Sequence, residues 1–218
     1  MQVLVRFAHT LDASMKSFAF ADGLAPLLLR LILAPVMMQA GWNKLAHFEA
    51  TASWFGDSLG LPAPALMAAL AAGAELGGGI LLLLGLATRA VAVPLMVTML
   101  VAITTVHWEH GWLAISDSSS WLANMRVEEA AARKARAIAI LREHGDYAWL
   151  TEHGPITILN NGIEFAATYF AMLLALFFSG GGRYTSVDYW LARRWPAPPR
   201  PAAGAAAPAR EHWSRTAR

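Results

Sequence analysis

The chain has no cysteine and few charged residues. Asp, Glu, Lys and Arg together make up only 15% of its 218 residues. The absence of cysteine excludes thiol–disulfide chemistry by the chain itself and removes thiolates from the available metal ligands. Soluble domains carry about 25% charged residues, so this chain is depleted in them. The composition therefore disfavours an ordinary soluble domain.

Hydrophobic residues make up 56% of the sequence and gather in long runs. Each run has about 17–24 residues, close to the roughly 20 that a helix needs to cross a hydrocarbon core of ~30 Å. A helix on the surface of a soluble protein would carry a polar face, whereas these runs are apolar nearly all round. The sequence therefore predicts four membrane spans, at residues 24–41, 64–86, 90–106 and 156–179.

These runs predict an all-α integral membrane protein with a four-transmembrane-helix bundle over residues 23–190. Apolar residues spaced by three or four predict an interfacial amphipathic helix over 1–22. The segment 107–155 is too polar to cross a membrane and is predicted to be a helical extramembrane insert, with a surface helix over 127–144. Residues 191–218, rich in Pro, Ala and Arg, are predicted to be a disordered basic tail.

The basic residues are scattered, and the formal net charge is +2. They form no single patch with interleaved aromatic residues, so the lipid bilayer, and not nucleic acid, is the expected partner. No cleavable signal peptide is evident, because the first long apolar run starts near Leu24 and is long enough to span. The Lys and Arg bias of the short loops predicts that both termini are cytoplasmic. The sequence leaves the oligomeric state open.

Two charged residues lie inside the predicted spans. A charged side chain at the bilayer centre costs roughly 2.5–3.5 kcal/mol on insertion scales, so such residues are usually paired and often functional. Glu75 lies near the middle of the second run and Arg30 lies within the first. Their depths, at a rise of 1.5 Å per residue, favour an Arg30–Glu75 ion pair. A purely structural pair and a functional one are both open.

Other polar residues gather at span ends, and their faces would form a polar cup leading inward to Glu75. Such a cup would suit a quinone head, a proton path or a metal. His107 and His110, spaced i and i+3, are candidate copper ligands, although the spacing fixes no third ligand. The intramembrane polar candidates are Arg30, Lys44, Glu75, His107, Asn160, Asn161 and Glu164.

Two glycine clusters form structural motifs. Small residues four apart let helix backbones approach closely, so the second run is predicted to be a central, tightly packed helix. Its glycines are Gly73, Gly77 and Gly78. The other motif follows the fourth run and comprises Gly180, Gly181, Gly182, Arg183 and Asp188.

Several motifs occur in order along residues 24–190: "LLRLILAPVMMQAGWNKLAHF", "GLPAP", "AELGGGILLLLGLATR", "HW" and "FFSGGGRYTSVDYW". Through them the chain resembles the DoxX family of small four-span membrane proteins, with Arg30, Lys44 and Glu75 within the matching motifs. The resemblance implies a multi-pass protein of the bacterial inner membrane that acts as an accessory or redox partner. Some DoxX relatives are membrane subunits of quinone-linked sulfur or thiol oxidoreductase systems.

The stretch "LNNGIEFAATYF" and the long insert resemble the HvfX branch of that family. This resemblance implies a role in maturing or handling a copper-binding modified peptide, beside a multinuclear iron oxygenase. Quinone and copper are accordingly the candidate cofactors. A small proton-coupled transporter or exporter using Glu75 and Glu164, and a structural membrane anchor for a partner protein, are the alternatives. Whether the chain is an enzyme, and which residues would be catalytic, stays open.

Overall fold

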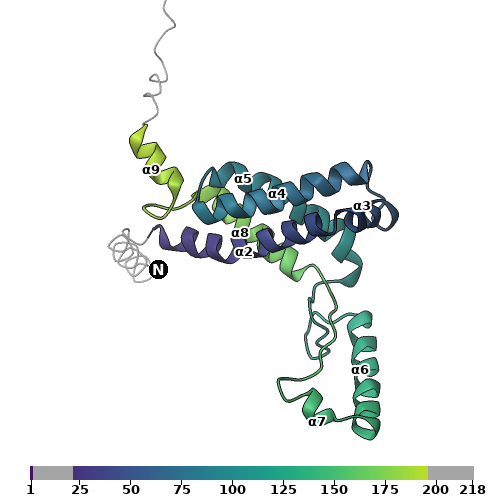
Figure 1. The fold of residues 1–218 in the computed structure, drawn as a ribbon. Helices are drawn as coiled ribbons and strands as arrows, with labels where there is room; N and C mark the ends of the chain where they lie inside the picture. The colour runs from purple at the N-terminus through teal and green to yellow at the C-terminus, as the bar shows by residue number, and fades with distance from the viewer. Residues whose placement is uncertain (2–21, 196–218) are drawn as a thin grey trace, which may run out of the picture.

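The computed structural model describes residue 1 and residues 22–195. Four helices run side by side as a bundle: α2 (Leu24–Ala46), α4 (Pro64–Leu84), α5 (Thr88–Val101) and α8 (Glu164–Ser179) (Figure 1). The amphipathic helix predicted over 1–22 and the tail beyond Trp195 lie outside the described residues. The predicted all-helical bundle architecture is confirmed for the described part of the chain.

Helix α4 has a central place in the bundle, as predicted. It packs against α2 on one side and α5 on another, while α8 contacts α5 and α2 and so completes the ring. Gly85 ends α4 in the left-handed conformation, at φ +66°, and the chain turns directly into α5. The core between the helices is apolar, with fully buried side chains from all four, including Leu33, Leu82, Leu95 and Leu173.

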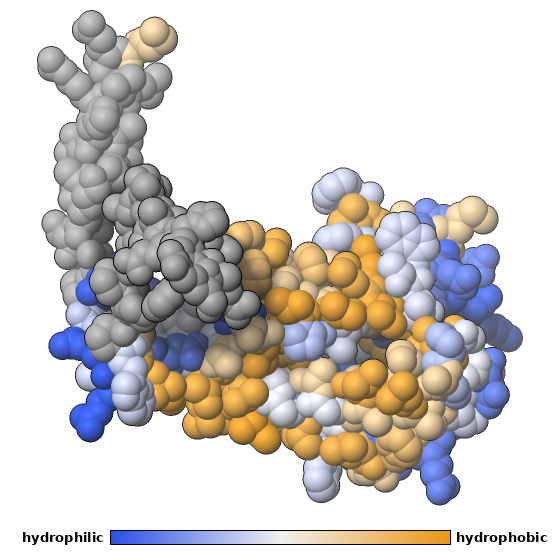
Figure 2. Space-filling view, turned by 90° about the horizontal axis from the view of Figure 1, so that it is seen from above, coloured by the Kyte–Doolittle hydropathy of each residue, from blue (hydrophilic) through white to orange (hydrophobic). Residues whose placement is uncertain are grey.

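Three helical stretches in the described residues are long and apolar enough to cross a membrane: Leu24–Ala46, Pro64–Leu84 and Thr88–His110. The third continues from α5 through a π-helical turn, η2 (Ala102–His107), and a 3₁₀ turn, η3 (Trp108–His110). These stretches correspond to the first three predicted spans. The surface of the bundle is correspondingly apolar: in Figure 2 hydrophobic residues cover its middle and hydrophilic ones gather toward both ends.

The fourth predicted span is only partly helical. Helix α8 has 16 residues, shorter than the length required of a candidate span, and it begins at Glu164. Residues 156–163 instead run beside residues 111–116, where the Ser116 amide donates to the Ile158 carbonyl at 2.9 Å and the Gly162 amide donates to the Leu113 carbonyl at 3.0 Å. Because these backbone groups are paired between loops, they do not form a helical turn ahead of α8.

Residues 111–163 form an arm that leaves the side of the bundle. Its main helix, α6 (Met125–His144), confirms the predicted surface helix and lies at a steep angle to the bundle helices, with α7 (Tyr147–Leu150) beside it (Figure 1). The Asn124 side chain caps α6 by accepting from the Val127 amide at 3.1 Å. In the same arm Ser119 donates its amide and hydroxyl to Asp117, which lowers the pKa of that carboxyl below its usual range.

Two further helices were not expected from the sequence. Helix α3 (Phe48–Asp57) follows α2 and packs against α4, where the sequence indicated a loop. Helix α9 (Val187–Arg194) is capped by the Ser186 hydroxyl, which accepts from the Tyr189 amide at 3.2 Å. The disordered tail predicted from residue 191 is therefore wrong for residues 191–194, because this cap and an apolar-aromatic first turn start a helix that includes them.

Only some glycines of α4 bring helices close together. A Cβ at Gly79 would lie 2.6 Å from the Met38 side chain of α2, and one at Gly78 would lie 3.1 Å from Leu95 of α5. In contrast, a Cβ added at Gly73 or Gly77 would meet nothing within 4 Å among the described residues. The packing role predicted for the glycine motif holds for Gly78 but not for Gly73 and Gly77, because a Cβ at either of those two positions would lie in open space.

Helices α2 and α4 approach each other closely at Gly41, and Gly41→Ala is expected to destabilise the protein by about 1–3 kcal/mol, as overpacking does. The added Cβ would lie 2.4 Å from the Leu76 amide nitrogen and 2.8 Å from the Ala72 carbonyl oxygen, and backbone cannot move aside cheaply. Thermal unfolding of the purified protein in detergent measures the effect. Gly77→Ala is the matched control and should cost nothing, because alanine favours helix. Equal losses in both variants would contradict this packing.

Candidate functional site

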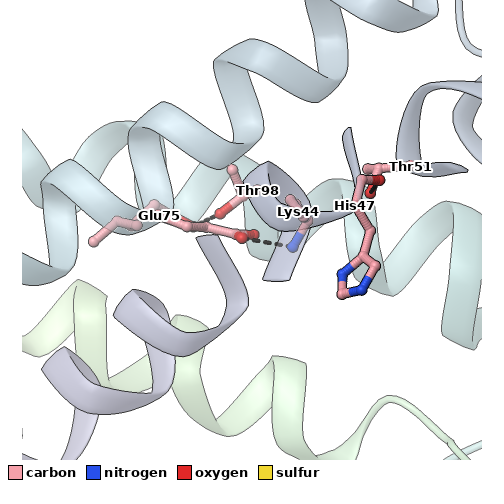
Figure 3. A network of polar contacts seen from close by, with 6 residues as sticks. Lys44, His47, Thr51, Glu75 and Thr98 are labelled. Atoms are coloured by element: carbon pink, nitrogen blue, oxygen red, sulfur yellow. Dashed lines mark hydrogen bonds and ion pairs between the residues drawn. The ribbon is translucent and has the colours of Figure 1, made fainter. Parts of the chain in front are cut away.

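The buried carboxylate of α4 is paired with a lysine of α2. Lys44 Nζ donates to Glu75 Oε2 at 2.5 Å, and the Glu75 side chain is 5% exposed whereas that of Lys44 is 23% exposed. Figure 3 shows the two side chains pointing toward each other, with Thr98 of α5 nearby. The Thr98 hydroxyl donates to the carbonyl of Leu95 at 2.8 Å. The pair thus places charged groups in the interior of the bundle.

The predicted Arg30–Glu75 ion pair is wrong. Arg30 is completely buried, and its guanidinium donates to backbone carbonyls: Nη1 to Leu82 at 3.2 Å and Nη2 to Thr185 at 2.9 Å. Side chains tilt toward the N-terminus of their own helix. In antiparallel helices, Lys44 is therefore directed along α2 toward Glu75, whereas Arg30 is directed away from it, to the C-terminal end of α4.

A cavity of about 870 Å³ lies beside the Lys44–Glu75 pair, between α3, α4 and the stretch from α5 to η2. Its walls are mostly apolar, and Trp54 and Phe55 come from α3. Polar groups reach it at only a few lining positions, namely Lys44, Glu75, Thr98, Thr105 and His107. The cavity is therefore an apolar chamber with a few convergent polar groups, which is the usual composition of a small-molecule site.

Two histidines meet at one backbone carbonyl. The Nδ1 atoms of His107 and His110 lie 2.8 Å and 3.0 Å from the Asn161 carbonyl oxygen. Asn161 has φ +62°, a left-handed conformation that is uncommon for residues other than glycine. Such backbone strain persists only where surrounding contacts determine it, and it is concentrated at functional sites.

The contacts that fix this carbonyl come from the neighbours of Asn161. Asn160 Nδ2 donates to the carbonyls of His110 and Leu113 at 2.8 Å and 2.6 Å. Glu164 Oε2 accepts from the Ala114 amide at 2.9 Å. These two side chains thus hold the loops together, and neither of them lines the cavity.

The predicted polar cup is therefore divided. Lys44, Glu75 and His107 line the cavity, whereas Asn160, Asn161 and Glu164 form the loop network behind His107. The sequence interpretation missed Thr98, a hydroxyl residue within a predicted span whose position opposite Glu75 depends on helix packing. It also placed Asn160 on a helix, although the helix begins only at Glu164.

No metal centre is assembled around the two histidines. Within residue 1 and residues 22–195, no group of three or more His, Cys, Asp or Glu side chains is placed to hold a metal ion. The copper ligands His107 and His110 remain a prediction without a third protein ligand in that part of the chain.

The second glycine motif lies at the opposite end of the bundle from α3. Gly181 packs against Thr88 and Ser186, where a Cβ would lie 2.7 Å from each side chain. Asp188 accepts from the amides of Ala87 and Thr88 at 2.7 Å and 2.9 Å, so it caps the start of α5 from a distant part of the chain. Arg183 lines a cleft of about 630 Å³ here. The motif joins α9 to the α4–α5 turn.

The chain is similar to known proteins over part of its length. The DoxX family model matches residues 25–108. A curated relative from Bacillus subtilis (strain 168), named "Putative oxidoreductase CatD", is 44% identical over 80 residues, which are 37% of this chain and 58% of the relative. The chain thus covers less than two thirds of that relative's length. No solved structure matches the chain significantly.

The matched residues contain α2, α4 and α5 with Lys44, Glu75 and His107, whereas the arm and α8 lie outside them. Three apolar helices of membrane-spanning length and this family match together indicate a multi-pass membrane protein. Residues 25–108 of the chain are therefore the part that is similar to the DoxX family.

Proposed function

We propose that this protein is the membrane component of a redox system and that its cavity binds the head of an isoprenoid quinone. The observation that carries the proposal is the Lys44–Glu75 pair on the wall of an otherwise apolar cavity of about 870 Å³. A quinone head is a flat apolar ring with two carbonyl acceptors. The Lys44 ammonium has three donors, of which Glu75 uses one, so it can donate to such a carbonyl.

The similarity to CatD supports a redox role, since that relative is named an oxidoreductase. The chain has no cysteine that could exchange electrons. Electron transfer by this protein would therefore depend on a bound carrier, and the protein's contribution would be to bind and orient it. This contribution fits an accessory protein that binds the carrier beside a catalytic partner.

A proton-coupled transporter is less well supported by the geometry. Its two candidate carriers, Glu75 and Glu164, serve different structures: Glu75 pairs with Lys44, whereas Glu164 accepts from the Ala114 amide and does not line the cavity. A relay would need them on one polar path. We therefore rank the redox function above transport and above a purely structural anchor.

A narrower proposal comes from the resemblance to the HvfX branch. In it, the protein supports the maturation of a copper-binding modified peptide beside a multinuclear iron oxygenase, in the bacterial inner membrane and with both termini cytoplasmic. Genes for such an oxygenase and for a Cys-rich precursor next to this one would support the proposal. An isolated gene would count against it.

Lys44→Gln is expected to reduce the quinone retained by the detergent-purified protein about 10-fold, because one charge-assisted hydrogen bond contributes about 1.5–3 kcal/mol. Solvent extraction and chromatography of the purified protein measure the bound quinone. Arg133→Gln is the matched control, since Arg133 is a cation in an exposed pair with Glu129 at 3.0 Å, and should leave the amount unchanged. Wild-type protein that neither retains nor takes up quinone would overturn the proposed function.

A further inference from the structure

The shared carbonyl of Asn161 selects the tautomer of two imidazole rings. A carbonyl oxygen accepts hydrogen bonds and cannot donate them, so each Nδ1 that faces it, at 2.8 Å in His107 and 3.0 Å in His110, carries the proton. In its neutral form each ring therefore has the proton on Nδ1 and a free lone pair on Nε2.

The backbone on both sides of the hydrogen bond between His107 and the Asn161 carbonyl has an unusual conformation. The helical stretch from α5 changes to a π-helical turn over Ala102–His107, and such π-bulges are frequent at functional sites. On the other side, the Asn161 amide donates to the Ala114 carbonyl at 2.9 Å and keeps the residue in its left-handed conformation. The carbonyl is thus positioned by loop contacts on one side, and the ring is positioned by the helix on the other.

Only one of the two histidines reaches the cavity. His107 lines it, together with Lys44, Glu75 and Thr98, whereas His110 does not. Of the other polar groups on the wall, the Glu75 carboxylate already accepts from Lys44, and the Thr98 hydroxyl donates to a helix carbonyl. The neutral His107 imidazole thus donates its Nδ1 proton to the Asn161 carbonyl and leaves Nε2 as a hydrogen-bond acceptor.

We infer that His107 Nε2 accepts a hydrogen bond from a hydroxyl of the bound ligand, and that it gives the cavity a preference for the reduced, quinol form over the oxidised quinone. The inference rests on the proposed function, because it assumes a ligand of this class. An oxidised head carries only acceptors and cannot donate to Nε2, whereas the reduced head carries two hydroxyl donors. Asn161 acts through His107 as a positioning residue.

The test compares the affinities of the full-length protein for decylubiquinol and decylubiquinone, measured separately by equilibrium titration in detergent. His107→Phe keeps an aromatic ring but removes the acceptor, so the affinity for the quinol should fall about 5- to 10-fold, as expected for one neutral hydrogen bond. The affinity for the oxidised quinone should change much less. His110→Phe removes a donor to the same carbonyl without touching the cavity and should keep the wild-type ratio of the two affinities.

A second measurement is made on the wild-type protein. Nuclear magnetic resonance of ¹⁵N-histidine-labelled protein should show Nδ1 protonation of the two rings whose signals are lost in His107→Phe and in His110→Phe, and decylubiquinol should shift the Nε2 signal of the ring assigned to His107. An unchanged Nε2 signal, or equal losses of quinol and quinone affinity in His107→Phe, would overturn this inference while leaving the proposed function standing. Failure of the wild-type protein to bind either form would overturn both.

Discussion

Arg30→Met is expected to lower the free energy of unfolding by about 3–5 kcal/mol, because a buried group left without its hydrogen-bond partner costs about 1–3 kcal/mol and more than one is affected. Arg30 is fully buried and donates to the carbonyls of Leu82, Leu83 and Thr185. It thereby caps the end of α4 and ties it to the segment before α9. Denaturant unfolding in detergent, followed by circular dichroism, measures the loss.

The control for this prediction is Arg89→Met. Arg89 is exposed and donates to the Phe178 carbonyl at 3.0 Å, so its loss should cost far less than that of Arg30. The variant that combines Arg30→Met with Glu75→Leu should be about as unstable as the two separate losses added together, since the residues do not touch. A double variant more stable than Arg30→Met alone would restore the ion pair that the sequence predicted and contradict the geometry described above.

Lys44→Met should cost about 3–5 kcal/mol as a single change, because it leaves the buried Glu75 charge without its partner, and Glu75→Leu should cost less, because the Lys44 left behind is 23% exposed. The double variant Lys44→Met/Glu75→Leu should be more stable than either single one, since it replaces both charges by apolar groups of similar size in an apolar wall. A double-mutant cycle measured by the same unfolding assay gives the coupling free energy.

The exposed pair Glu129–Arg133 on α6 provides the reference cycle. Its side chains are 60% and 77% exposed, so the coupling there should be only about 0.3–0.5 kcal/mol, the usual value for helix pairs of this spacing. Strictly additive losses at Lys44 and Glu75 would show that the pair is not a buried unit, and they would also weaken the case for Lys44 as a ligand donor.

Much of the fold was predictable because lipid-facing helices must be apolar along their whole length. The runs that begin at Leu24, Pro64 and Ala90 each gave a helix of the expected position, and the prolines inside them, Pro35 and Pro94, do not end those helices. The start of α8 was not predictable in the same way. The residues before Glu164 have apolar character too, but their backbone groups pair with the loop after His110, and hydropathy does not register such pairing.

The candidate site was predictable in its residues but not in its pairings. The high cost of placing a charge in the bilayer singled out Arg30 and Glu75 inside the apolar runs. Lys44 was singled out as a polar residue at the end of a span. Which cation pairs with Glu75 depends on the direction of the Cα–Cβ bonds in antiparallel helices. The prediction compared only the depths of the residues in the membrane and did not include this direction. The two histidines were visible from their spacing, whereas the carbonyl that joins them belongs to a loop about fifty residues away.

The walls of the cavity also determine how a molecule reaches it. Several of its lining residues lie on the outside of the bundle, among them Leu70, Val97 and Val101, which are 57%, 54% and 38% exposed. On a membrane-embedded helix that exposure is to acyl chains, so we expect a ligand to enter the chamber sideways from the hydrocarbon phase. A hydrophobic solute is already concentrated there by partitioning. Apparent affinities should therefore follow the mole fraction of solute in lipid or micelle, and dilution of the buffer alone should leave occupancy almost unchanged.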